Sequence, residues 1–147
     1  MKFLIAFVFI IFLFSFNSNN QEATSNLKIE VLGFPNNKGK ARISVFSKEN
    51  KKSFPDKYTK ATYKYILPIK DNKVIHTIEN IPYGEYAVVV HHDSNEDNEI
   101  NTNWLGIPKE SFGASNDAKG SFGPPDYEDA KFQINKSQLT IKINMNK

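Results

Sequence analysis

The feature that most constrains the fold is an alternation of apolar and polar residues with a period of two, which recurs along the chain from about residue 26. In the segment 27–32, for example, Leu27, Ile29 and Val31 share one face. Successive side chains of a strand point to opposite faces, so this alternation is typical of a half-buried strand. No stretch of ten or more residues after residue 26 keeps the stripe of an amphipathic helix. The sequence therefore predicts an all-β fold.

Seven strands are predicted. Turn residues at 35–39 favour a hairpin between the first two strands. The segment 85–93 is apolar on both faces over its centre, as in an inner strand. Short strands without a sustained helix predict one domain, residues 24–147, folded as an antiparallel seven-stranded sandwich, with a closed barrel as the main alternative. The predicted strands are 27–34, 41–46, 63–69, 73–81, 85–93, 130–135 and 139–145.

A further fold marker lies between the fourth and fifth predicted strands, in the sequence IENIPYGEYAVVV (78–90). Pro82 and Gly84 predict a tight turn, and Tyr86 enters the next strand on its buried side. The phrase resembles the lP-x-G-x-Y turn that recurs in transthyretin-like and immunoglobulin-like sandwiches. This resemblance implies a sandwich of that kind and indicates no activity.

The first 20 residues are predicted to be a signal peptide. Lys2 precedes about fourteen almost wholly apolar residues, and small polar residues follow, with cleavage expected within about 18–23. The apolar run is shorter than the roughly 20 residues that a membrane span needs, and a retained anchor is the alternative. The chain has no cysteine, which excludes disulfides, thiolate metal sites and a lipid-modified cysteine. We expect an exported monomer, periplasmic or secreted, with no membrane span after cleavage.

The charge of the chain gives little reason to expect nucleic acid as a ligand. The isoelectric point near 9.0 arises from 19 Lys and Arg against 16 Asp and Glu, and only the segment 48–60 clusters basic residues. A nucleic-acid surface needs a basic face with stacking aromatics. A solvated lysine-rich loop is the simpler interpretation, so no nucleic-acid partner is expected.

One long segment, 94–129, interrupts the strands and is predicted to be a loop. Loops of this length inside a compact domain are usually functional or disordered. Its aromatic residues can fold it back onto the sandwich, or they can contact an envelope or extracellular ligand, a glycan or a protein. The first role is the simpler one. These aromatic residues are Trp104, Phe112, Phe122 and Tyr127.

The sequence HHDSNEDNEINTNWLGIPKESFGASNDAKGSFGPPDYEDAKF (91–132) resembles the signature of a bacterial exported family, domain of unknown function 2141. That family's pattern runs HD-x-N-x-N-G-x-L-D-T-N-x-x-G-I-P-x-E-G-Y-G-F-S-N-N, followed by F-G-P-P-x-F-x-D-A-x-F. The resemblance implies a secreted or periplasmic β-sandwich of unknown biochemical role. This chain departs from the pattern at Asn98, in place of glycine, and at Asp97 and Asn101, which exchange Asn and Asp. Ser111 and Ala114 replace the family's Gly and Phe.

The oxygen-bearing residues after the fifth predicted strand suggest a calcium site. They fall at alternate positions, as in a D-x-[DN]-x-[DN] loop, with Asn98 at the sharp turn. Position 12 is Trp104 rather than a bidentate glutamate, and no helices flank the loop, so a carboxylate must come from farther along. Glu110, which matches the family's Glu, is the first candidate and Asp117 the second. The predicted ligands are Asp93, Asn95, Asp97, the carbonyl of Glu99, Asn101 and Glu110; the alternative is an Asx-rich turn that caps backbone amides.

Two other chemistries are weaker. His91 and His92 are adjacent on a strand and point to opposite faces, so they do not suit one zinc ion, and His92 is expected to orient the loop through a hydrogen bond. An envelope hydrolase could use paired carboxylates, but the sequence lacks the motifs of the common hydrolytic nucleophiles. Whether the protein is an enzyme stays open. The carboxylates available for hydrolysis are Glu110, Asp126, Glu128 and Asp129.

Overall fold

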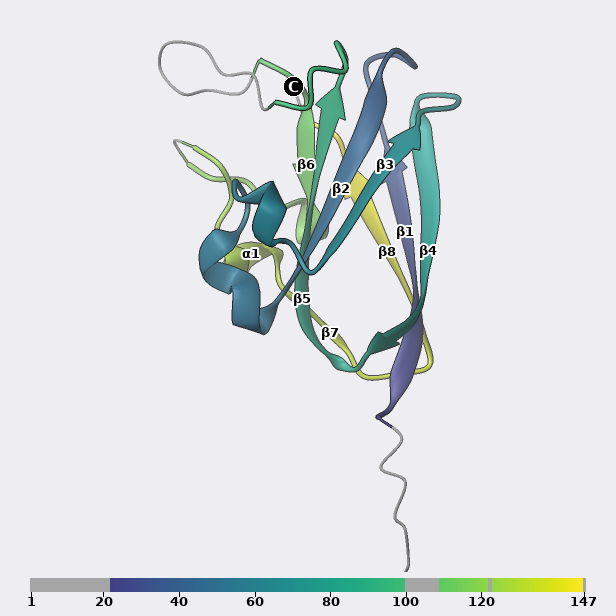
Figure 1. The fold of residues 1–147 in the computed structure, drawn as a ribbon, viewed down its shortest axis with the longest axis vertical. Coiled ribbons are helices and arrows are strands. Elements are labelled where there is room, and N and C mark those ends of the chain that lie inside the picture. The colour runs from purple at the N-terminus through teal and green to yellow at the C-terminus, as the bar shows by residue number, and fades with distance from the viewer. Residues whose placement is uncertain (1–21, 100–108, 122, 147) are drawn as a thin grey trace, which may run out of the picture.

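The computed structural model describes residues 22–99, 109–121 and 123–146, and within them the chain forms eight strands in two sheets (Figure 1). Their alternating apolar residues form these strands as the sequence predicts, so the fold is all-β. The elements are β1 (Thr24–Leu32), β2 (Lys40–Ser47), the 3-10 helices η1 (Lys48–Ser53) and η2 (Tyr58–Lys60), β3 (Tyr63–Pro68), β4 (Lys73–Pro82), β5 (Gly84–Asp93), β6 (Phe112–Ala114), η3 (Ser115–Asp117), the helix α1 (Tyr127–Ala130), β7 (Phe132–Ile134) and β8 (Gln138–Asn144).

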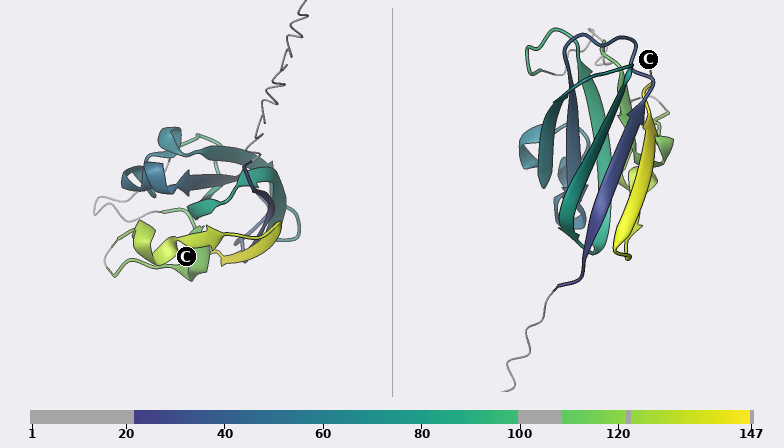
Figure 2. Two further views of the ribbon diagram at one scale, coloured as in Figure 1. Left: turned by 90° about the horizontal axis from the view of Figure 1, so that it is seen from below. Right: turned by 90° about the vertical axis from the view of Figure 1, so that its right-hand side faces the viewer.

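The two sheets face each other as layers (Figure 2). One has the strand order β4-β1-β8, and the other has the order β3-β2-β5-β6, with β7 also paired to β5. Apolar side chains from both sheets fill the space between them, among them Ile29 of β1, Ile43 of β2 and Val88 and Val90 of β5, all fully buried. The prediction that 85–93 is an inner strand is confirmed, because β2 pairs with β5 on one side and β6 and β7 on the other.

The predicted hairpin between the first two strands is wrong. β1 pairs antiparallel with β4, where Leu27 lies opposite Ile78, and parallel with β8, where it lies opposite Leu139. β2 lies in the other sheet, so the connection 33–39 crosses between sheets. The parallel pair also means that the sandwich is not wholly antiparallel. Periodicity reports which face of a strand is buried and does not identify the partner strand.

All seven predicted strands have a counterpart in the structure, and the eighth strand, β6, lies in the segment 94–129 that the sequence predicts to be a loop. The same segment also contains η3 and α1. β6 has three residues, too few for a periodic signal. Its alignment on β5 gives this segment a fixed position against the sheet, with Ala114 opposite Val89 and Gly113 opposite Val90.

A second apolar cluster lies on the outer face of the β3-β2-β5-β6 sheet, where η1, η2 and α1 are placed (Figure 1). Phe54 packs edge-on against Phe46 and Tyr127, with ring centroids 5.5 and 5.8 Å apart. The hydroxyl of Tyr127 donates to the carbonyl of Glu85 at 3.3 Å. Tyr127 is therefore buried and fastens its segment to the sheet, whereas Trp104 and Phe122 lie outside the described residues.

The turn between β4 and β5 also follows the prediction. Tyr86 is buried, and its hydroxyl donates to the carbonyl of Pro82 at 3.1 Å. Burial raises the pKa of Tyr86 to about 12. In the described part of the chain no helix has the length and apolar character needed to cross a membrane. The predicted signal peptide, residues 1–20, lies outside that part.

Candidate functional site

The candidate site begins where β5 ends, at Asp93. This carboxylate is 2% exposed. Its Oδ2 accepts a hydrogen bond from the backbone N–H of Asn98 at 3.1 Å, and its Oδ1 is buried with no hydrogen-bond partner among the described residues. Asn98 has a φ of 63°, a left-handed conformation that asparagine tolerates better than most residues. The loop thus closes on one carboxylate oxygen and leaves the other unsatisfied.

The connection between β1 and β2 covers Asp93 from the other side. Gly39 has a φ of +69°, and a Cβ added there would lie 2.0 Å from the carbonyl oxygen of Asp93. The ring of His92 is buried, and its Nε2 lies 2.7 Å from the carbonyl of Lys38. A carbonyl oxygen only accepts, so Nε2 carries the proton. His92 therefore fixes the end of β5 through a hydrogen bond, and only glycine fits at position 39.

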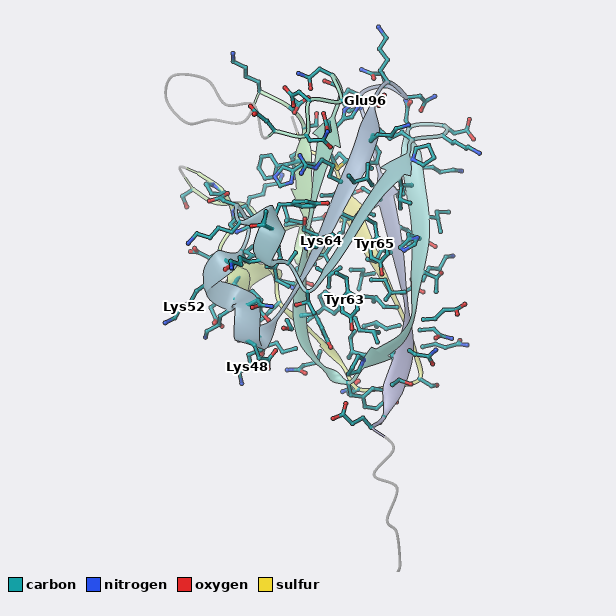
Figure 3. All side chains as sticks on the ribbon, viewed as in Figure 1. Lys48, Lys52, Tyr63, Lys64, Tyr65 and Glu96 are labelled. Atoms are coloured by element: carbon teal, nitrogen blue, oxygen red, sulfur yellow. The ribbon has the colours of Figure 1, made fainter. Side chains whose placement is uncertain are left out.

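Asn95 and Asp97 form a local network within the loop. Asn95 Nδ2 donates to Asp97 Oδ2 at 2.7 Å, and the backbone N–H of Asp97 approaches Asn95 Oδ1 at 3.4 Å. The backbone N–H of Glu99 donates to Asp97 Oδ1 at 2.9 Å. An Asx turn is defined by a backbone N–H that donates to the side-chain oxygen of the Asn or Asp two residues earlier. Glu96, next to them, lies at the upper end of the molecule, away from Lys48 and Lys52 of η1 (Figure 3).

Glu110 reaches the same loop from a distant part of the chain. Its Oε1 accepts hydrogen bonds from the backbone N–H and the hydroxyl of Ser94, both at 2.8 Å. The structure therefore brings Glu110 to the residue that follows Asp93. Asp117 serves elsewhere, because its two oxygens accept from the backbone and side-chain N–H groups of Asn144 at 2.9 and 2.8 Å. The predicted ligand Asn101 lies outside the described residues.

These carboxylates do not converge on one point. Among the residues that the structure describes, no group of three His, Asp or Glu side chains is arranged to hold a metal ion. The oxygens of Asp97 and Glu110 satisfy donors of the loop, as an Asx-rich turn requires. Asp93 Oδ1 is the exception, since it is buried and accepts no hydrogen bond from any residue that the structure describes.

The sequence matches the profile of a family described as "Uncharacterized protein conserved in bacteria (DUF2141)" over residues 29–142. The chain belongs to this family. The match runs from β1 into β8 and includes the whole candidate site, so the resemblance noted over 91–132 is confirmed. Comparisons with curated proteins and with solved structures find no significant match.

In this DUF2141 domain the carboxylates considered for hydrolysis lie in two places. Glu110 is bound to Ser94, whereas Glu128 belongs to α1 and forms ion pairs with Lys131 and Lys51 at 2.5 and 3.4 Å. Hydrogen bonds from these lysines lower the pKa of Glu128. A general acid needs the opposite shift, so Glu128 is unsuited to that role.

Arg42, the only arginine of the chain, is a candidate functional residue that the sequence motifs do not indicate. It lies on β2 opposite His91 and is 6% exposed. Its guanidinium carbon lies 4.3 Å from the ring centroid of Tyr58. Burial, assisted by the charge of Arg42, lowers the pKa of His91 to about 4. The available signal was a lone charged residue among the uncharged residues of the strand 41–46.

Arg42 also lines an open groove of about 390 Å³ beside the candidate loop. η2 and the residues before it form one wall, and the loop after β5 forms the other. The residues that line the groove with Arg42 are Asp56, Lys57, Tyr58, Thr59, Asn98 and Glu99.

Proposed function

We propose that this protein is an exported binding or structural module of the cell envelope whose loop after β5 is ordered by calcium. The observation that carries the proposal is the buried Oδ1 of Asp93, which has no hydrogen-bond partner in the described part of the chain. Leaving a buried acceptor unsatisfied is costly. A cation bound to Oδ1 would remove that cost.

The loop geometry supports a calcium ion as that cation. Asp93 stands at position 1 and Asn98 at position 6, where calcium loops make their sharp turn. Oδ2 of Asp93 is held by the amide of Asn98, so Oδ1 is left to bind the ion. Calcium takes six to eight oxygen ligands in flexible geometry. The other ligands would be those that the sequence pattern predicts: Asn95, Asp97, the carbonyl of Glu99, Asn101 and Glu110.

Binding of the ion would exchange hydrogen bonds for metal bonds. Asp97 Oδ2 accepts from Asn95 Nδ2, and rotation of the two side chains would release oxygens toward the ion. Glu110 needs less change, since only its Oε1 is engaged by Ser94. Magnesium would be a poor substitute, because it demands compact octahedral geometry.

The remaining parts of the proposal rest on the sequence. The apolar segment after Lys2 favours export to the periplasm or the medium, and the IPYGEY turn favours a sandwich of the immunoglobulin-like or transthyretin-like kind. Two structural observations favour a binding role over a hydrolytic one: Glu110 is bound to Ser94, away from the three carboxylates that line one groove at α1, and lysine contacts lower the pKa of Glu128. N-terminal sequencing of protein recovered from the periplasm or medium tests export. A start near residues 19–24 is expected, and an intact Met1 would refute it.

Calorimetric titration tests the calcium site. Mature protein stripped with chelator should bind calcium with a dissociation constant of roughly 0.1–1 mM, typical of extracellular modules, and Trp104 emission should change in parallel. Asp93→Asn keeps the shape of the side chain and removes its charge, so it should abolish both responses. Absence of binding at concentrations well above that range would reduce the loop to an Asx-rich turn.

A further inference from the structure

The sole arginine of the chain is a buried cation without a counter-ion. Arg42 is 6% exposed, and no salt bridge or hydrogen bond of the described residues involves its guanidinium group. Its Nε is buried and has no hydrogen-bond partner in the described part of the chain. All 16 Asp and Glu residues of the chain lie within the described part. None of them forms an ion pair with Arg42, although Asp56 and Glu99 line the same groove.

The buried Nε is unfavourable without a partner. The two terminal nitrogens are not among the buried unpartnered atoms, so in the open groove they can meet water or a ligand. Stacking on Tyr58 holds the group in place and supplies a cation–π contact, but it satisfies no N–H donor. Burial keeps His91 neutral at pH 7, so His91 neither adds to nor compensates the charge.

We propose that the groove beside Arg42 binds the carboxylate of an acidic ligand. The planar guanidinium fork matches a carboxylate with two parallel hydrogen bonds. The groove that Arg42 lines has a volume of about 390 Å³, enough for one sugar or amino-acid residue. Thr59 and Asn98 at its walls offer hydrogen bonds to the neutral part of the ligand.

The charges around the groove favour a singly charged carboxylate over phosphate. Asp56 and Glu99 line it together with Lys57, so its rim carries two negative charges and one positive charge besides Arg42. A phosphate dianion would be repelled more strongly than a carboxylate. The same carboxylate chemistry could come from a uronic acid or from the C-terminus of a peptide. Both sources present one carboxylate beside polar groups.

This inference does not depend on calcium. Asn98 belongs to both the groove and the loop, yet the guanidinium of Arg42 is placed by β2 and Tyr58. A titration that fails with calcium therefore leaves the carboxylate test intact. The two tests use different substitutions, at Asp93 and at Arg42.

The experiment is an NMR titration of the mature domain with four probes at constant calcium concentration. The acidic probes are glucuronic acid and an N-acetylated dipeptide with a free C-terminus, and the neutral controls are glucose and the dipeptide amide. Titration with either acid should shift the backbone amide signals of Thr59 and Asn98 until the site is saturated. The acid with the lower dissociation constant indicates whether the natural ligand is a uronic acid or a peptide C-terminus. Neutral controls that bind equally well, phosphate that binds more tightly than both acids, or no shift with either acid would overturn the proposal.

Two variants locate the contact. Arg42→Gln should weaken the acidic probes by roughly 10–100-fold, as expected for a charge-assisted hydrogen bond of a buried group, without changing the response to the neutral controls. Because a buried position can affect folding, Glu99→Gln provides a second measure. Removing the negative charge of Glu99, which repels an acidic ligand, should raise the affinity for the acidic probes by up to about fivefold and leave the affinity for the neutral probes unchanged. Unchanged affinity in Glu99→Gln together with Arg42→Gln binding as wild type would refute the site.

Discussion

Asp93 and Asn98 are joined by one hydrogen bond that uses half of a buried carboxylate. The backbone N–H of Asn98 donates to Oδ2 at 3.1 Å, while Oδ1 accepts nothing from the described residues. The amide closes the loop around the carboxylate, and the left-handed φ of 63° at Asn98 makes that closure possible. The proposed calcium ion would bind the second oxygen, Oδ1, which this hydrogen bond leaves unused.

The first prediction concerns the thermal effect of calcium. At about ten times the dissociation constant, binding should add about 1.4 kcal/mol of stability, which raises the melting temperature by a few degrees. Asp93→Asn should eliminate this shift. Asp117→Asn is the matched control, because Asp117 binds Asn144; it should lower the melting temperature without calcium and keep the calcium-induced rise. Equal calcium shifts in wild type and Asp93→Asn, measured by differential scanning fluorimetry, would contradict the proposed ligand.

The second prediction concerns the glycine packed against Asp93. Gly39→Ala places a Cβ 2.0 Å from the carbonyl oxygen of Asp93 at a φ of +69°, so the crossing connection must shift. We expect a loss of about 2 kcal/mol or more in the free energy of unfolding, measured with urea. Gly123→Ala is the control, because an added Cβ there meets nothing within 4 Å. A loss at Gly39 no larger than at Gly123 would show that the connection adapts freely.

The strands could be predicted from the sequence because burial of one face forces alternation. This alternation predicts β1 from Leu27, Ile29 and Val31, and all three side chains are fully buried. Their period does not state which strand lies alongside, and the predicted hairpin failed for that reason. The crossing that replaces it brings Gly39 against Asp93, a contact that depends on tertiary structure alone.

The candidate site shows the same distinction between features that are local in sequence and features that depend on tertiary structure. Asp93, Asn95 and Asp97 could be identified because they are close in sequence, and their hydrogen bonds form within the loop. Arg42 could not, because its relation to His91 arises from the register of β2 on β5. Its burial against Tyr58 requires η2 to fold over the sheet. The sequence of the strand 41–46 alone indicates neither of these contacts.

The third prediction tests the inner strand. Val88 is fully buried between the sheets, so Val88→Asp would bury a carboxylate without a partner and cost several kcal/mol, a large part of the stability of a small domain. Ile75→Asp is the matched control, because Ile75 is 52% exposed on β4; it should change stability by no more than about 0.5 kcal/mol. A native-like melting temperature for Val88→Asp would contradict the position of β5.

The last prediction concerns pH. Desolvation, assisted by the charge of Arg42, lowers the pKa of His91 to about 4 in the folded protein, whereas an unfolded histidine titrates near 6.5. The unfolded chain therefore binds the proton first, so the contribution of neutral His91 is fully present above about pH 6.5 and is lost as pH falls toward 4. Between pH 7 and 5 the free energy of unfolding should drop by about 2 kcal/mol from this group. His91→Gln should remove most of that slope in urea titrations at each pH. Burial also lowers the pKa of His76, so a smaller pH dependence of the same sign should remain in His91→Gln. If the pH dependence in His91→Gln equals that of the wild type, His91 is accessible to protons in the folded state.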